Sequence, residues 1–121
     1  MHFYLTLIIL ILFSSVALAD DLKTHFIDVG QGDATFIELP NNETILIDAG
    51  NNGDGDTIIS YIKSQGFNVI NYLIGTHPHA DHIGGIDHII NNIKVKKFYM
   101  PKVTHTTKTF EDVLLAAKNN N

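Results

Sequence analysis

Short apolar runs alternate with polar, glycine-containing segments along most of the chain. Alternation and β-branched content predict five strands, over residues 23–29, 34–39, 44–47, 71–76 and 95–100. Apolar residues at helical spacing predict three helices, over residues 57–65, 83–93 and 109–118. The turn at residues 40–43 indicates that the chain begins with antiparallel strands. The later alternation of strands and helices predicts an α/β fold with a mixed sheet.

Residues that favour helix ends support these boundaries. Asp56 is expected to cap the amino end of the first helix, and Gly66 to end it. Thr109 and Asp112 have the spacing of a capping box, which predicts that Thr109 caps the last helix.

The first 19 residues differ from the rest because they are uncharged and mostly apolar. They end in Ala17-Leu18-Ala19, a small-x-small pattern, and two acidic residues follow. This layout predicts a secretory signal peptide over residues 1–19 and a secreted or extracytoplasmic domain over residues 20–121, with no stable membrane partner after cleavage. The alternative is an uncleaved membrane anchor, since the segment carries no Lys or Arg and is almost long enough to span a bilayer.

Composition narrows the chemistry of this domain. A chain of 121 residues allows one domain at most, and the absence of Cys excludes disulfides, thiolate metal sites and thiol nucleophiles. The formal net charge is −5, yet six of the eight basic residues, all of them lysines, fall within residues 94–118. We interpret this lysine cluster as a solvated face, with contact to phosphates as the alternative.

The segment 76–82, Thr-His-Pro-His-Ala-Asp-His, holds most of the functional information. His77 and His79 are two positions apart, so in an extended chain both side chains point to the same side. Pro78 fixes the backbone between them. Asp81 and His82 stand at the start of the following helix, where the chain turns back. Imidazole and carboxylate are the ligands that Zn²⁺ and related ions use when Cys is absent, so the segment predicts a metal site.

Three stretches of the sequence resemble one family. The HxHxDH pattern at 77–82 resembles the metal motif of the metallo-β-lactamase superfamily, and Ile45-Leu46-Ile47-Asp48-Ala49-Gly50 resembles its earlier strand–Asp–Gly motif. Asp28-Val29-Gly30-Gln31-Gly32-Asp33-Ala34 resembles the DVGQGDA signature of the branch that contains the hydrolase domain of the ComEC family of DNA-uptake proteins. The resemblance implies an αββα sandwich, of which this chain holds the N-terminal half.

The resemblance also implies a role for each matching residue. His77 and His79 would bind a first divalent ion, and Asp81 and His82 a second, with zinc favoured and manganese the alternative. Asp81 would also act in catalysis by orienting the bridging hydroxide that attacks the substrate. Asp48 would hold the metal loop from behind the ligands.

Other candidates are weaker. Asp33 would support the loop or contact substrate, the alternative being a turn residue bonded to its own backbone. We interpret His88 and His105 as non-ligands and His25 as a structural or surface histidine. The Asn- and Asp-rich loop at 50–56 suggests calcium but lacks the glutamate that an EF-hand requires, so we interpret it as a turn.

The superfamily's remaining three ligands lie further downstream than this chain extends. We therefore expect about half of a domain, in a truncated or fragmentary chain whose partner is the missing C-terminal half. The resemblance implies hydrolysis of phosphodiesters such as DNA. Hydrolysis of lactams, thioesters or lactones at the same site, and a catalytically incomplete product, remain alternatives. The substrate is accordingly expected to be a nucleic acid or a small molecule.

Overall fold

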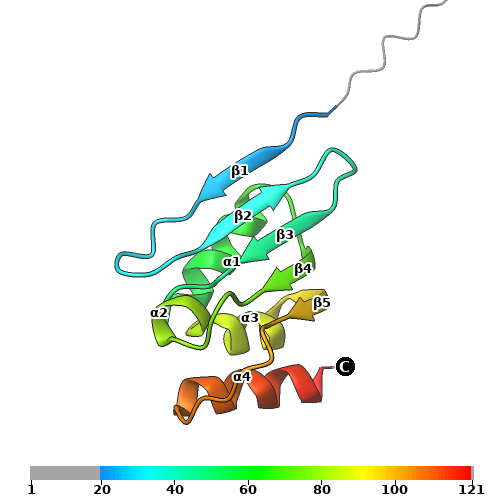
Figure 1. The fold of residues 1–121 in the computed structure, drawn as a ribbon. Helices are drawn as coiled ribbons and strands as arrows, with labels where there is room; N and C mark the ends of the chain where they lie inside the picture. Colours follow the sequence, from blue (N-terminus) through cyan, green and yellow to red (C-terminus); the bar gives the residue numbers. More distant parts are fainter. Residues whose placement is uncertain (1–19, 121) are drawn as a thin grey trace, which may run out of the picture.

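The computed structural model describes residues 20–120 (Figure 1). The predicted signal peptide at 1–19 lies outside these residues and stays a prediction. Within the described part of the chain, none of the helices has the length and apolar character that crossing a membrane requires.

Five strands form one mixed sheet in the order β1-β2-β3-β4-β5 (Figure 1). The strands are β1 (Lys23–Phe26), β2 (Thr35–Glu38), β3 (Thr44–Ile47), β4 (Val69–Ile74) and β5 (Lys94–Tyr99). The first three are antiparallel, whereas β3, β4 and β5 run parallel. Parallel neighbours need long crossovers, and helices supply them here. The predicted α/β fold with a mixed sheet is confirmed.

The helices are α1 (Gly55–Ser64), α2 (Ala80–Ile83), α3 (Ile86–Asn92) and α4 (Lys108–Asn119). The prediction of one continuous helix over 83–93 was wrong, because the chain breaks between α2 and α3 at Gly84-Gly85. Continuing α2 would require the carbonyls of Asp81 and His82. Those carbonyls instead accept hydrogen bonds from Asp33 N at 3.1 Å and Ala49 N at 2.7 Å. Contacts with neighbouring loops thus replace the helical bonds.

Both predicted helix caps were wrong by two residues. The N-cap of α1 is Asp54, and Asp56 lies in the first turn of that helix. The N-cap of α4 is Thr107, whose side-chain oxygen accepts a hydrogen bond from Phe110 N at 3.3 Å. Thr109 instead faces the loop before α1, where its hydroxyl accepts from the Asn52 amide at 3.0 Å. Asp56 bonds to His88 and Thr109 bonds to Asn52, so each side chain joins two parts of the fold. These tertiary contacts outweigh local capping.

The core lies between one face of the sheet and the helices. Phe36, Leu46 and Leu73 occupy neighbouring positions on β2, β3 and β4 and are fully buried. The helices cover them with apolar side chains that are also buried, namely Ile58, Ile62, Ile86, Ile89, Phe110 and Val113. Burial of these faces is the main favourable contribution to folding.

The opposite face of the sheet carries apolar side chains that are only partly buried. One row, in register across all five strands, consists of Phe26, Thr35, Ile47, Ile74 and Tyr99. Phe26 is 84% exposed and Tyr99 is 51% exposed. In the described part of the chain this face therefore remains open to solvent.

The break at Gly84 generates a stability prediction. A Cβ on this residue would lie 2.2 Å from both Asn51 C and Asn52 N, which are backbone atoms that cannot move aside cheaply. We expect Gly84→Ala to lower the free energy of unfolding by about 3 kcal/mol, measured by urea denaturation.

Gly30→Ala is the matched control for this measurement. Gly30 has φ +68° but nothing within 4 Å of an added Cβ, so its substitution costs only the left-handed backbone, about 1 kcal/mol. A smaller loss for Gly84→Ala than for Gly30→Ala would contradict the close approach.

Candidate metal centre

The site forms where two neighbouring parallel strands end. Ile47 of β3 pairs with Ile74 of β4, so the residues that follow them meet at one edge of the sheet. Asp48 N donates to the Ile74 carbonyl at 2.8 Å, which fixes the start of the loop after β3. The carboxyl ends of parallel strands are where α/β proteins place their ligands.

The Asp48 carboxylate connects the loop after β3 to the histidine loop. It is 3% exposed and accepts hydrogen bonds from Thr76 N at 2.7 Å and from Thr76 Oγ1 at 2.6 Å. It also accepts from His82 Nδ1 at 2.9 Å. Because a carboxylate only accepts, Nδ1 of His82 carries a proton, so in the neutral imidazole Nε2 keeps a free lone pair.

Thr76 sets the tautomer of His77 in the same way. Its hydroxyl has one proton, which it gives to Asp48, so it can only accept from His77 Nδ1 at 3.1 Å. His77 therefore also carries its proton on Nδ1 and keeps Nε2 free. Hydrogen bonds of this kind orient imidazoles that bind metals.

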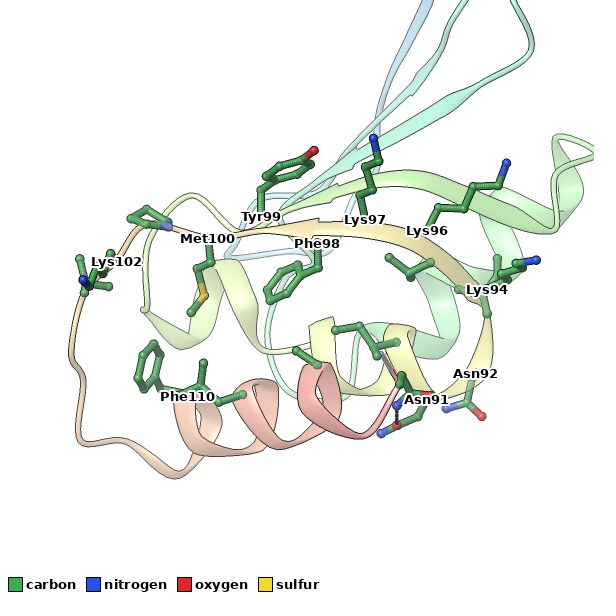
Figure 2. A pocket seen from close by; sticks show the side chains of 18 of the residues that line it. Asn91, Asn92, Lys94, Lys96, Lys97, Phe98, Tyr99, Met100, Lys102 and Phe110 are labelled. Carbon is green, nitrogen blue, oxygen red and sulfur yellow. Dashed lines mark hydrogen bonds between the residues drawn. The ribbon is translucent and has the colours of Figure 1, made fainter.

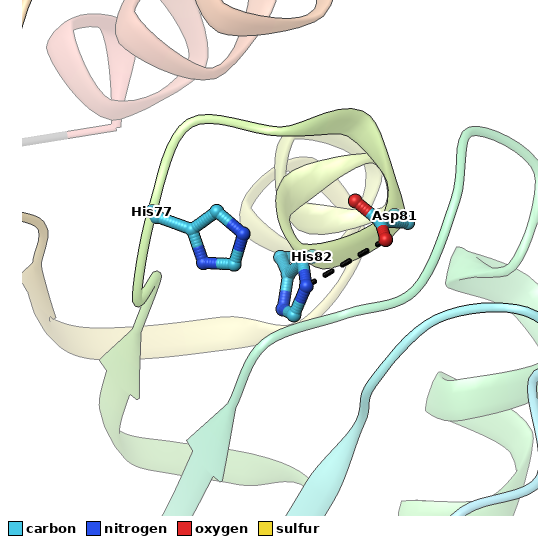
Figure 3. A group of neighbouring side chains, drawn as sticks. All are labelled: His77, Asp81 and His82. Atoms are coloured by element: carbon cyan, nitrogen blue, oxygen red, sulfur yellow. Dashed lines mark ion pairs between the residues drawn. The ribbon is translucent and has the colours of Figure 1, made fainter.

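His77, Asp81 and His82 form the group in this structure that is best arranged to hold an ion (Figure 3). Each offers one ligand atom, and these atoms lie within 4.8 Å of one another. Asp81 Oδ2 lies 3.6 Å from His82 Nε2, and all three side chains are half-buried. Two imidazole nitrogens and a carboxylate oxygen fit a divalent ion such as zinc. These roles nonetheless stay predictions.

His79 lies beside this group without belonging to it. Its ring centroid is 4.9 Å from that of His77, but its side chain is exposed. His79 is also the N-cap of α2, where its carbonyl accepts from His82 N and Ile83 N, both at 3.0 Å. These backbone bonds begin α2 and so set the direction of the Asp81 and His82 side chains.

Asp33 reaches the site mainly through its backbone. Its amide donates to the Asp81 carbonyl at 3.1 Å and its carbonyl accepts from Gly50 N at 2.9 Å. The carboxylate is 69% exposed and lies 3.5 Å from His82 Nδ1. Gly32 allows this approach, because a Cβ there would lie 2.6 Å from the Asp81 carbonyl. This geometry favours the role of loop support.

Two further histidines have partners away from the site. His25 bonds to Tyr61 Oη and to Glu38 Oε1, both at 2.9 Å, between β1, β2 and α1. His88 bonds to Asp56 Oδ1 at 2.7 Å and so joins α3 to α1. Both act as structural links in this fold.

A hollow away from the site lies between β5 and α4 (Figure 2). It is an open groove of about 1340 Å³ whose lining contains none of the predicted metal ligands. Phe98 of β5 and Met100, which follows β5, point toward α4, whereas Lys97 and Tyr99 point away (Figure 2). Lys94, Lys96 and Lys97 are exposed at this sheet edge, which is compatible both with a solvated face and with contact to phosphates.

Sequence reasoning assigned no role to Thr76. The sequence does show a threonine just after one apolar strand, Thr76, and an aspartate just after another, Asp48. Recognising it required the pairing of β3 with β4, which places the two residues side by side.

In this structure, histidines and aspartates lie together at the ends of parallel strands. This arrangement is typical of α/β proteins that bind a metal ion. Residues 27–120 match the metallo-beta-lactamase superfamily, and the chain belongs to that family. The family's fold implies binding of a divalent metal, which the group at His77, Asp81 and His82 is suited to provide.

Two curated relatives match parts of the chain. ComE operon protein 3 of Bacillus subtilis (strain 168) is 27% identical over 128 residues, which is 92% of this chain and 16% of the relative. The Beta-lactamase hydrolase-like protein of Agrobacterium fabrum is 32% identical over 59 residues, 49% of this chain and 14% of the relative. The chain therefore spans less than a fifth of either relative's length.

Solved structures agree with the fold. The metallo-beta-lactamase SMB-1, bound to 2-mercaptoethanesulfonate, is 28% identical with a TM-score of 0.52, over 58% of this chain and 27% of the other. A HARLDQ-motif mutant of a metallo-beta-lactamase from Cronobacter sakazakii is 28% identical with the same TM-score of 0.52, over 60% of this chain and 30% of the other. The predicted metallo-β-lactamase fold is thus confirmed for the region that aligns.

The hydrogen bonds of Asp48 generate a prediction about metal affinity. Asp48→Asn keeps the size of the side chain and tolerates the left-handed φ of 60° at this position. Its amide, however, cannot accept from three donors, so one imidazole loses its orientation. We expect the affinity for Zn²⁺ to fall about 10–100-fold, measured by competition with a chromophoric chelator.

Asp56→Asn is the control, because its carboxylate is 87% exposed and bonds to His88 outside the site. Equal losses of affinity in the two variants would contradict the role assigned to Asp48.

Proposed function

We propose that this chain forms the metal-binding half of a hydrolase that uses two divalent ions, favouring zinc, to cleave phosphodiesters such as DNA. The observation that carries the proposal is the buried Asp48 carboxylate, which orients His77 and His82 beside Asp81. His82 Nε2 lies 3.6 Å from Asp81 Oδ2, so a divalent ion bound by both atoms would satisfy the imidazole lone pair and the carboxylate together.

The ligands would divide between two positions. His77 and His79 would hold one ion, and Asp81 and His82 the other. Divalent ions supply a water nucleophile near neutral pH and stabilise the attacking and leaving oxygens. The protein's own contribution is to fix His77 through Thr76 and His82 through Asp48 before substrate arrives. Asp81, half-exposed beside His82, would orient the attacking water.

Two features support a phosphodiester substrate. The segment 28–34 resembles the DVGQGDA signature of the ComEC-like branch, and the chain is 27% identical to ComE operon protein 3. The exposed lysines of β5 also give this otherwise acidic chain a positive edge that could attract phosphates.

The alternative is hydrolysis of a lactam. Its support is the 28% identity to two solved metallo-beta-lactamases and the local match to a Beta-lactamase hydrolase-like protein. We favour the phosphodiester because that relationship extends over 92% of the chain rather than over 49–60%.

We further propose that the open sheet face packs against the C-terminal half of a metallo-beta-lactamase domain. The partly buried row from Phe26 to Tyr99 has the apolar character that sheet-on-sheet packing requires. The solved neighbours also extend well beyond the aligned region, which is 27–30% of their length. That second half would supply the remaining ligands that the resemblance implies.

The proposal is tested on the 121-residue chain loaded with zinc or manganese. We expect metal bound by this chain alone, measured by mass spectrometry of metal content. Once the C-terminal half is supplied, we expect cleavage of single-stranded DNA but not of nitrocefin. His79→Ala should reduce cleavage about 100-fold or more, because an ion loses one of its ligands.

His88→Ala is the control, since it removes an imidazole that bonds to Asp56 outside the site. Cleavage of nitrocefin alone would favour the lactam alternative. A metal-loaded chain that cleaves neither substrate would show that this half is catalytically incomplete, and a chain that binds no metal would refute the proposed function.

A further inference from the structure

The turn at residues 51–54 contains an asparagine that is followed by a glycine. Asn52-Gly53 is the one Asn-Gly pair in the sequence, and both residues are exposed. Such pairs are chemically reactive, because the glycine nitrogen can approach the preceding side-chain amide without obstruction by a Cβ. In a folded protein, the reaction depends on how the fold holds that nitrogen and that amide.

The structure leaves the Gly53 nitrogen unhindered. Gly53 has φ +97°, and apart from its chain neighbours no atom lies within 4 Å of the position that a Cβ would take. None of the hydrogen bonds within residues 20–120 uses the Gly53 nitrogen; the turn is instead closed by Asp54 N, which donates to Asn51 O at 3.1 Å. A small open hollow of about 200 Å³ beside Asn52 and Gly53 admits water.

A single neighbour restrains the Asn52 side chain. Its Nδ2 donates to Thr109 Oγ1 at 3.0 Å, and the same hydroxyl lies 3.4 Å from its Oδ1. Both contacts are exposed to solvent. A hydrogen bond between neutral groups contributes little net free energy, so the need to release the amide slows a reaction only about fivefold.

The neighbouring Asp54-Gly55 pair has related covalent chemistry but a closed environment. The Asp54 carboxylate accepts from Asn51 N at 2.7 Å, and Gly55 is buried at the start of α1. A Cβ on Gly55 would lie 2.7 Å from His88 Cδ2, so there is no space for rearrangement at that residue. The fold therefore protects Asp54 and leaves Asn52 open.

We propose that Asn52 is a site of spontaneous deamidation, with water as the co-reactant. The lone pair of Gly53 N forms a bond to Asn52 Cγ, and the bond from Cγ to Nδ2 breaks. Ammonia leaves with the proton that Gly53 N gives up, and a succinimide ring remains. Water then opens the ring. Cleavage of the bond between Cγ and nitrogen yields aspartate, and cleavage of the bond between the main-chain carbonyl carbon and nitrogen yields isoaspartate.

Modification at this position changes contacts that shape the loops around the site. Isoaspartate makes the main chain one methylene longer, and a Cβ on Gly84 would already lie 2.2 Å from Asn52 N. Close by, the Gly50 carbonyl accepts from Gly84 N at 2.9 Å. Both products also lose the Nδ2 donor to Thr109 and gain a negative charge. We therefore expect the isoaspartate form to be less stable than the unmodified chain.

The test is to incubate the folded 121-residue chain in mildly alkaline buffer and to locate modified residues by peptide mass spectrometry. We expect aspartate and isoaspartate to accumulate at Asn52 about tenfold faster or more than at Asn42, because only Asn52 has an unhindered nitrogen within reach. Asn42 is the internal control, since it is exposed and has φ 62° but precedes Glu43. No isoaspartate is expected at Asp54.

Two matched variants isolate the reacting side chain. Asn52→Gln keeps an amide that can bond to Thr109, but its reaction would have to close a larger ring, so modification at this position should stop. Asn42→Gln should leave the rate at Asn52 unchanged. The same chain unfolded in urea gives the rate of an unrestrained pair, and the folded rate should lie within about tenfold of it.

The inference is overturned if Asn52 in the folded chain reacts no faster than Asn42 while the urea-unfolded chain reacts readily. The isoaspartate form, separated by anion exchange, should unfold at a lower urea concentration than the fresh chain. An unchanged midpoint would overturn the effect on the loops. These measurements use the wild-type chain, so they decide the matter even if Asn52→Gln does not fold. The proposed function is not at stake, because no metal takes part in the reaction.

Discussion

The Asp48 carboxylate accepts three hydrogen bonds from the histidine loop, and the arrangement of the site depends on them. A buried carboxylate is costly unless its lone pairs are satisfied, and here the donors come from a segment 28–34 positions away in sequence. The same bonds place the protons of His77 and His82 on Nδ1. The pairing of β3 with β4 therefore also orients the His77 and His82 side chains.

The sheet and its mixed character could be predicted because each strand is a short apolar run between glycine- or proline-containing turns. The gathering of side chains at 77–82 could be predicted in part from their spacing: the structure brings His77, Asp81 and His82 together and leaves His79 outside the group. That these residues bind metal stays a prediction. Both the apolar runs and this spacing are local properties, so they can be read directly from the amino-acid sequence. The agreement with the superfamily adds what local properties cannot show, namely that the region belongs to a known fold.

What could not be predicted depends on contacts between segments. Gly84-Gly85 ends a helix because the Asp81 and His82 carbonyls bond to other loops, and no periodicity reports such a competitor. Asp56 and Thr109 have the composition of caps, but each bonds across the fold to His88 or Asn52. The contact of Thr76 with Asp48 follows from the pairing of β3 with β4. No local pattern in the sequence shows that contact.

Backbone hydrogen bonds join the three loops around the site. Asp33 donates to Asp81, Gly50 to Asp33, Ala49 to His82, and Gly84 to Gly50. Because each loop is both donor and acceptor for another, none can open without breaking bonds to its neighbours. Such segments behave as one cooperative unit of local unfolding rather than as three independent loops. The metal centre would accordingly fluctuate as a whole, so an ion would be gained or lost through a collective opening and not through the motion of a single side chain.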